Sequence, residues 1–367
     1  MVYADVLQSV AFVTLAFLAL FFFFDFVDEL RSVNQGVGGG YPLKFALVVV
    51  LLESPSRLYD LLPITVLIGT IFVMARMAQN SEFTILRTSG LGPWRALQIL
   101  VGLGLMFVLL TFAVGDYVAP AADRAGQLLR SRYLGQITIG QTGAWLKERQ
   151  GDDSYSVNVR SLLPNGGMRG VRVVEFNAQG RLVSVIQAAQ GSFASDGSWL
   201  LKDVSRIDFN TERVAATSTK PESIIRSVEP SLRWPSTITS EMVSVALLQP
   251  DRMPTVDLFQ YMRHLEANGQ SSQRYEIEFW KKVFYPLSCL VMVVLALPFA
   301  YLHFRAGGIS TYVFIGVMTG ISFFLLNNLF GHFGNLQNWR PWLAAAAPGL
   351  IYSVLSLGAF GWLVVRR

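Results

Sequence analysis

Six apolar stretches constrain the fold of this chain more than any other feature of its sequence. A membrane-spanning helix needs ~20 mostly apolar residues, and five of these stretches contain 19 to 26 residues without a charged side chain. The remaining stretch has 15 residues, and Arg76 at its end can extend its side chain to the membrane surface. The six stretches are residues 6–24, 61–75, 96–115, 283–302, 306–331 and 341–365. The sequence therefore predicts an α-helical membrane protein with six transmembrane helices, in a 3+3 arrangement.

The composition and the charged loops agree with a membrane protein. Charged residues make up 15% of the chain, against about 25% in a soluble domain. The first stretch lacks a basic segment before it and an A-x-A pattern after it, so we interpret it as a retained span. Short basic loops favour the cytoplasmic side, and in a six-span arrangement one side carries Arg76, Arg87, Arg95, Arg305, Arg366 and Arg367. The opposite loops carry Arg31, Lys44, Arg57 and Arg340, so the charge bias is modest.

The region between the third and fourth spans has the pattern of an all-β domain. Short apolar runs alternate with Gly- and Asn-rich turns, which is typical of a sandwich or jelly roll. The predicted strands are residues 142–147, 155–160, 170–176, 182–188, 199–204 and 207–209. Residues 119–134 and 255–268 flank them and have helical spacing. We expect this domain to lie outside the membrane, on the side opposite the basic loops.

The short loop between the second and third spans predicts a helix at the membrane surface, over residues 81–90. Asn80 or Ser81 can cap this helix, and Glu82 lies in its first turn, where a carboxylate stabilises the helix dipole. Gly90 is suited to the position just after a helix end, and Pro93 can begin the next helix. Two interpretations remain open: a tight connector at the interface, or a coupling helix that binds a soluble cytoplasmic partner.

Enzyme chemistry has no support in the sequence. The chain lacks the P-loop motif G-x-x-x-x-G-K-[ST] and the zinc motif H-E-x-x-H, and its three histidines lie far apart. Its single cysteine, Cys289, excludes an internal disulfide. The spans lack charges at mid-membrane depth, which argues against an ion-coupled transporter. Asn327 and Asn328 lie within the fifth span, where helix packing is the more common role for such side chains. We predict no cofactor and no metal site.

Several short motifs, in this order and at this spacing, resemble one protein family. They are Phe26-Val27-Asp28-Glu29-Leu30, Ser81-Glu82-Phe83 with Leu86-Arg87-Thr88-Ser89-Gly90, Val118-Ala119-Pro120, Phe279-Trp280-Lys281-Lys282, Leu295-Ala296-Leu297-Pro298-Phe299, Gly316 to Phe323 and Ala347-Pro348. Nearly the whole chain resembles the permease subunits of the bacterial lipopolysaccharide exporter, LptF/LptG, and the segment around Lys282 is similar to the LptG branch. Members usually carry a basic residue before the first tyrosine, whereas Val2 precedes Tyr3 here. Either the cytoplasmic end of the first span is shortened, or the start is misplaced.

The resemblance implies a role and a set of partners. It implies a permease subunit of an ABC transporter in the inner membrane, which extracts lipopolysaccharide and passes it to a periplasmic bridge. It also implies a sister permease (LptF-like), a cytoplasmic ATPase dimer (LptB-like) and a single-span periplasmic bridge protein (LptC-like). The chain would be divided into three parts. Residues 1–118 would contain the first three transmembrane helices, residues 119–277 a periplasmic β-jellyroll-like domain, and residues 278–367 the last three transmembrane helices. The alternative is a membrane-anchored scaffold whose β-domain binds a partner. A lipoprotein-releasing permease fits less well, because such proteins have four spans.

The resemblance also suggests site residues. Coupling to the ATPase would fall to Glu82, Phe83, Leu86 and Arg87. A phosphorylated headgroup would attract Arg31, Lys44 and Arg57 at the outer ends of spans one and two, although Arg31 can instead pair with Asp28. Acyl chains would contact apolar faces of spans one and five, formed by Phe17, Leu20, Phe21, Phe24, Phe314, Val317, Ile321 and Phe324. For any single apolar residue, contact with membrane lipid or core packing remains the commoner role.

Overall fold

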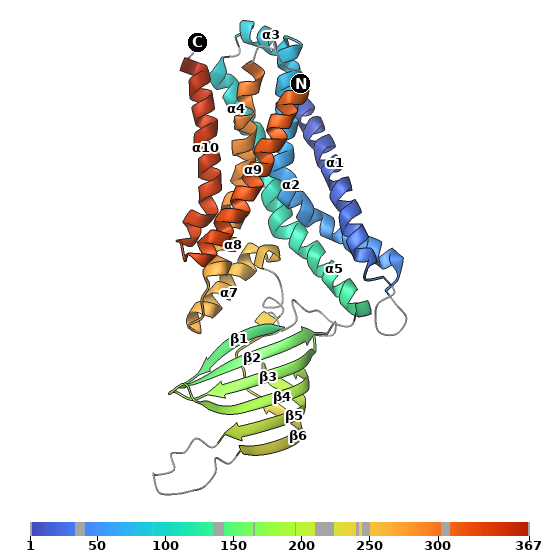
Figure 1. Ribbon diagram of the computed structural model, residues 1–367, viewed down its shortest axis with the longest axis vertical. Helices are drawn as coiled ribbons and strands as arrows, with labels where there is room; N and C mark the ends of the chain where they lie inside the picture. Colours follow the sequence, from blue (N-terminus) through green and yellow to red (C-terminus); the bar gives the residue numbers. More distant parts are fainter. Residues whose placement is uncertain are drawn as a thin grey trace.

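The computed structural model describes residues 2–33, 41–90, 92–134, 143–163, 166–194, 196–209, 224–239, 242–243, 250–301 and 309–365. The molecule is elongated, with a helical bundle at one end and a β-sheet at the other (Figure 1). Both ends of the described chain lie at the end of the bundle that is remote from the sheet (Figure 1). The even number of predicted spans requires this arrangement.

All six predicted spans are present as long apolar helices. They begin and end as α1 Val2–Leu30, α2 Leu43–Gln79, α4 Pro93–Ala113, α8 Gln273–Leu295, α9 Ile309–Leu336 and α10 Pro341–Val365. The largest difference from prediction concerns α2, which has 37 residues, whereas the charge-free run in its second half has 15. Its outer half contains Glu53, Arg57 and Asp60, which end the apolar run without ending the helix. All three line a cavity, and Arg57 and Glu53 also have partners on neighbouring helices, in Asp25 and Arg130.

Helix α2 is the centre of the bundle, and α1 and α9 both pack against it through glycines. A Cβ atom placed on Gly69 of α2 would lie 2.7 Å from Val10 of α1. One placed on Gly320 of α9 would lie 2.8 Å from Ile64 of α2. Such close approach of helices is possible only where the side chain is absent. Gly316 of α9 is similarly close to α2, since a Cβ atom there would lie 2.9 Å from Ile71.

The third span does not stop at the membrane surface. Helix α4 continues through a π-helical segment, η1 Val114–Val118, into α5 Ala119–Leu134. The predicted helical flank at residues 119–134 is therefore confirmed. A π-helical turn inserts one extra residue per turn into a helix, and such turns are frequent at functional positions.

Six antiparallel strands form one sheet, in which each strand pairs with the next along the chain. The strands are β1 Ala144–Gln150, β2 Asp153–Leu162, β3 Met168–Phe176, β4 Leu182–Phe193, β5 Trp199–Phe209 and β6 Ile224–Trp234. An inserted all-β domain is confirmed. The two last predicted strands are one continuous strand, β5. Strand β6 was not predicted, because Pro230 and several charges interrupt its apolar pattern; as an edge strand it tolerates a proline.

One face of the sheet is covered by the chain that follows it. Helix α7, Thr255–Ala267, places Leu258, Tyr261 and Leu265 in the same core as the sheet residues. Ahead of it come a short 3-10 helix, η2 Pro250–Arg252, and the buried Met253. The indole of Trp199 on β5 donates a hydrogen bond to the carbonyl of Ile238, at 2.9 Å. Helix α7 therefore belongs at once to the core of the β-domain and to the junction with the bundle.

Candidate functional site

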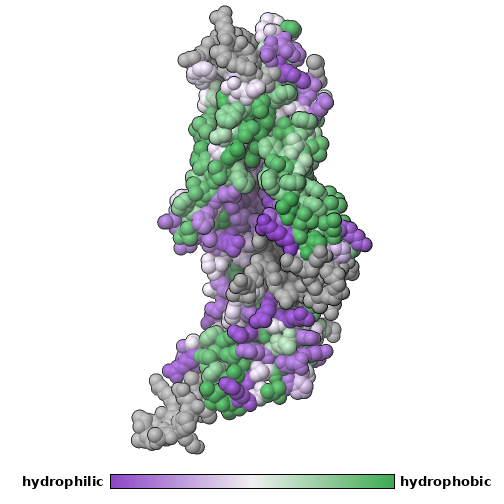
Figure 2. All heavy atoms as spheres, turned by 45° about the vertical axis from the view of Figure 1, so that its right-hand side comes forward, coloured by the Kyte–Doolittle hydropathy of each residue, from purple (hydrophilic) through white to green (hydrophobic). Residues whose placement is uncertain are grey.

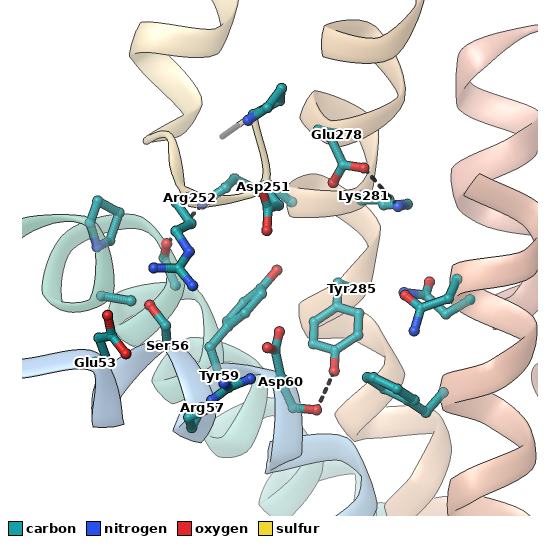
Figure 3. A pocket seen from close by; sticks show the side chains of 18 of the residues that line it. Glu53, Ser56, Arg57, Tyr59, Asp60, Asp251, Arg252, Glu278, Lys281 and Tyr285 are labelled. Atoms are coloured by element: carbon teal, nitrogen blue, oxygen red, sulfur yellow. Dashed lines mark hydrogen bonds and ion pairs between the residues drawn. The ribbon is translucent and has the colours of Figure 1, made fainter. Parts of the chain in front are cut away.

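A polar cavity of about 460 Å³ lies where the bundle meets the β-domain, between α2, α5, α8, α9 and η2. Figure 3 shows this cavity with its charged and aromatic side chains. On the face drawn in Figure 2, an apolar band covers the helices, and hydrophilic residues gather at the end of this band that is nearer the sheet. The cavity lies at this polar end of the apolar helices, next to the β-domain.

The cavity carries charges of both signs. Its cations are Arg57, Arg252, Arg274, Lys281 and Lys282, and its acids are Glu53, Asp60, Asp251 and Glu278. Lys281 pairs with Glu278 at 2.8 Å. No ion pair is recorded for Arg252 and Arg274 within the described residues. Guanidinium groups bind phosphate and carboxylate oxygens in a bidentate manner. The cavity can therefore accept a polar, charged group.

Arg57 is the predicted headgroup residue that reaches this cavity. It donates two hydrogen bonds to Asp25 of α1, at 2.9 and 2.8 Å, and its guanidinium lies 5.8 Å from the centre of the Phe21 ring. Phe324, predicted as part of the α9 wall, lines the same cavity. Residues from the predicted headgroup set and from the predicted apolar wall therefore lie around one space.

Arg31 and Lys44 do not line the cavity. Arg31 pairs with Asp28 at 3.6 Å, the alternative that the spacing suggested, and its side chain is 81% exposed. Lys44 lies over the ring of Phe45, at 5.2 Å. Both residues stay at the outer ends of α1 and α2, some distance along the surface from Arg57. The structure thus separates three cations that the sequence grouped together.

Arg130 is a cation that the sequence analysis missed. On α5, it pairs with the buried Glu29 of α1 and lies 3.8 Å from Glu53 of α2. These three residues line a second hollow, together with Asp25 and Asp28. The only signal in the sequence was the helical pattern of residues 119–134, which says nothing about the helix that Arg130 faces. The ion pairs hold the outer ends of α1, α2 and α5 together.

Buried polar contacts fix the opposite wall of the cavity. Lys282 of α8 is buried and donates a hydrogen bond to the carbonyl of Gly115, at 3.0 Å. The hydroxyl of Tyr285 donates to the carbonyl of Asp60, at 2.6 Å (Figure 3). Asn327 and Asn328 of α9 complete this wall. The sequence did not indicate a partner for these two amide side chains, and the structure places them at the cavity.

The predicted apolar walls on α1 and α9 are largely exposed at the surface of this chain. Exposed positions are Leu20, Phe24, Phe314, Ile321 and Phe324, and the partly buried ones are Phe17, Phe21 and Val317. Both helices pack against α2, so their remaining faces are free to contact lipid or another subunit. The structure leaves the lipid role of each residue as a prediction.

The surface helix α3, Glu82–Thr88, lies at the end of the bundle remote from the sheet (Figure 1). Gly90 follows it with a φ of 99°, as expected for the residue after a helix end. The side chain of Glu82 is partly exposed and accepts a hydrogen bond from Asn80, at 3.1 Å. Glu82 is therefore available at the first turn of the helix.

The four predicted coupling residues do not share one surface. Phe83 is buried, and its ring meets that of Tyr301 edge to face, with centres 4.8 Å apart. Ile85 is 63% exposed and Leu86 is 37% exposed. The side chain of Arg87 lies outside the described residues. Phe83 thus anchors the helix to the bundle, and the exposed face contains Ile85, which the sequence analysis did not select.

Comparison with known proteins agrees with this architecture. Residues 1–363 match the family of the lipopolysaccharide export system permease LptF/LptG. The chain is 28% identical over 345 residues to the lipopolysaccharide export system permease protein LptG of Escherichia coli K12, an alignment that covers 93% of this chain and 90% of that protein. It is 24% identical over the same length to LptG of Haemophilus influenzae. This multi-pass inner-membrane protein therefore belongs to the LptF/LptG family of lipopolysaccharide export permeases.

Proposed function

We propose that this chain is a non-catalytic permease subunit of an ABC transporter that extracts lipopolysaccharide from the inner membrane and delivers it to a periplasmic bridge. The family match over almost the whole chain carries this proposal. A charged cavity beside exposed apolar helix faces supports it, because an amphiphile needs both environments.

The phosphorylated headgroup would bind at the rim of the cavity, near Arg57, while acyl chains lie along α1 and α9. Arg57 is held by Asp25 in a fixed orientation, which lowers the entropy lost when a phosphate binds. Phe21 and Phe324 flank this position from two helices. Arg31 and Lys44, at the outer ends of α1 and α2, would contact the headgroup before it reaches Arg57, or not at all.

Energy would come from a separate cytoplasmic ATPase dimer that binds α3. The chain contains no P-loop motif in its sequence, and α3 presents Glu82 and exposed apolar side chains at the cytoplasmic end. The sister permease would complete the lipid site, and a single-span protein would extend the β-domain. We assign residues 1–118 and 278–367 to the membrane part and 119–277 to the periplasmic domain.

Purification of the tagged chain with its partners in detergent tests the proposal. We expect an ATPase and a sister permease to co-purify, and the ATPase rate to rise when lipopolysaccharide is added to the reconstituted complex. A chain that purifies without an ATPase, or a complex whose ATPase rate ignores lipopolysaccharide, would instead support a scaffold that binds a partner without transport.

A further inference from the structure

Asp116 joins the third span to the helix that closes the β-domain. It lies in the π-helical segment η1, and one of its carboxylate oxygens accepts two hydrogen bonds from Thr255, the first residue of α7. The backbone N–H of Thr255 donates at 2.7 Å and its hydroxyl at 2.6 Å. The two residues are 139 positions apart in sequence. The contact therefore links two segments that only the tertiary fold brings together.

The carboxylate supplies what α7 lacks at its own start. The residue before the helix is Pro254, and no side chain of the helix start caps it. The first N–H groups of a helix have no partner within the helix, and a negative charge near them is favourable. Asp116 provides this acceptor from another helix and adds its charge to that of Asp257 in the first turn of α7, so the orientation of α7 depends on the position of η1.

Helix α7 also packs against α8, where the ring of Tyr261 meets that of Tyr275, and against the core of the β-domain. Leu258 is fully buried, and Tyr261 and Leu265 are nearly so, in the same core as Trp199 of the sheet. A helix so anchored cannot turn without displacing the core of the sheet, because protein interiors are densely packed. Movement of the N-terminal end of α7 would thus be transmitted to the sheet.

Gly115, the residue next to Asp116, is held in place by contacts with two membrane helices, α8 and α2. The carbonyl of Gly115 accepts the hydrogen bond of Lys282 from α8. A Cβ atom at Gly115 would lie 2.3 Å from the ring of Tyr59 on α2, so only glycine fits there. Helices α2, α8 and α7 therefore meet within two residues of the third span, at the one π-helical segment of the described chain.

We infer that Asp116 is a positioning residue that makes α7 and the β-domain follow the movement of the membrane helices. This inference rests on the proposed transport function. Asp116 would act in delivery, after the lipid has entered the bundle, and would have no part in ATP hydrolysis. The neighbouring ion pair Arg124–Asp257 joins α5 to the same end of α7. Its arginine side chain is exposed, whereas Asp116 is partly buried, so this pair is a suitable comparison for the contact of Asp116.

Two substitutions remove the contact from opposite sides. Asp116→Ala deletes the acceptor, whereas Thr255→Pro deletes both donors and keeps the helix start, since proline is favoured at the first helical position. Pro254 has a ψ of 153°, which a following proline accepts. Each variant removes two hydrogen bonds to a charged group, and one such bond alone supplies about a tenfold factor. In the complete complex in liposomes, each variant should therefore lower the lipopolysaccharide delivered per ATP hydrolysed by about tenfold or more.

The controls separate coupling from folding and from the proposed function itself. The stimulated ATPase rate should stay near the wild-type value, Asp116→Glu should restore delivery, and Asp257→Asn should change it little. The double variant should be no worse than either single one. Wild-type delivery in Asp116→Ala or Thr255→Pro would overturn the inference, as would an equal fall in ATPase rate and delivery. If the wild-type complex delivers no lipid, the proposed function fails instead.

Discussion

The guanidinium of Arg57 and the carboxylate of Asp25 form a two-bond ion pair, at 2.9 and 2.8 Å, that ties α2 to α1 at the rim of the polar cavity. The arginine side chain is 39% exposed and the aspartate 16%. One arginine thus serves two purposes in the proposed function: it holds two helices together, and it offers charge to a headgroup.

Exchange of the two charges separates these purposes. Arg57→Ala should weaken the apparent affinity for lipopolysaccharide by about tenfold, because a charge-assisted hydrogen bond is lost. Arg57→Ala also breaks the ion pair with Asp25 and should lower the thermal stability of the complex. The double variant Asp25→Arg/Arg57→Asp should regain this stability without regaining affinity for lipopolysaccharide. Lipid-stimulated ATPase titrations and thermal unfolding in detergent measure the two effects. Recovery of both would show that Arg57 acts only through the contact between α1 and α2.

Substitution of Glu82 tests the coupling role of α3. A carboxylate in the first turn can meet a basic side chain of a partner, and the structure leaves Glu82 partly exposed. Glu82→Ala should release the ATPase during purification, or leave hydrolysis that no longer drives transport. Asn80→Ala removes the local hydrogen bond to Glu82 and should have little effect. Normal complex yield together with normal transport in Glu82→Ala would exclude the role.

Phe83 and Ile85 should respond in opposite ways. Phe83 is 6% exposed and packs against Tyr301, so Phe83→Ala should cost about 3–5 kcal/mol of stability, as for other buried phenylalanines. Ile85→Ala should change stability by less than about 0.5 kcal/mol and instead weaken binding of the ATPase. Thermal unfolding of the purified chain and co-purification of the ATPase distinguish the two. A stable Phe83→Ala chain would mean that the anchor is unnecessary.

Photo-crosslinkers can locate the acyl chains. Phe324 of α9 lines the cavity, and Phe21 of α1 lies beside Arg57 at its rim; both positions should capture lipopolysaccharide in the assembled complex. Leu355 on α10 is 55% exposed, which makes it a control for contact with bulk lipid, and it should capture little. Equal capture at all three positions, or none at the first two, would place the lipid elsewhere.

The β-domain should lose stability in acid through His264 of α7. Burial lowers the pKa of this imidazole from its ordinary value of 6.5, against an opposing effect of Glu148. The unfolded chain therefore binds the proton more readily, and the stability due to neutral His264 is present above pH 6.5 and lost as the pH falls. Tryptophan fluorescence should show that the midpoint of unfolding decreases as the pH is lowered from about 7.5 to about 5. In His264→Gln this fall should be smaller; an unchanged fall would assign it to other groups.

The membrane topology and the inserted sheet followed from the sequence alone, because each depends on a local pattern. An uncharged run of about 20 residues has few alternatives to a transmembrane helix. Alternating runs between Gly- and Asn-rich turns have few alternatives to hairpins. Five of the six strands and both helical flanks were predicted for this reason. Strand β6 was missed because Pro230 is tolerated only through its place at the sheet edge, which a local pattern does not contain.

The composition of the candidate site was decided by tertiary structure. Arg57 and Phe324 border one cavity because α2 lies between α1 and α9, and no spacing along the chain reports which helices are neighbours. Phe83 points into the bundle and Ile85 away from it, although both suit a surface helix. Asp116 and Thr255 meet across 139 residues. Local periodicity determines which segments become helices or strands, whereas contacts between distant side chains depend on how those elements pack, and this is fixed only when the whole chain has folded.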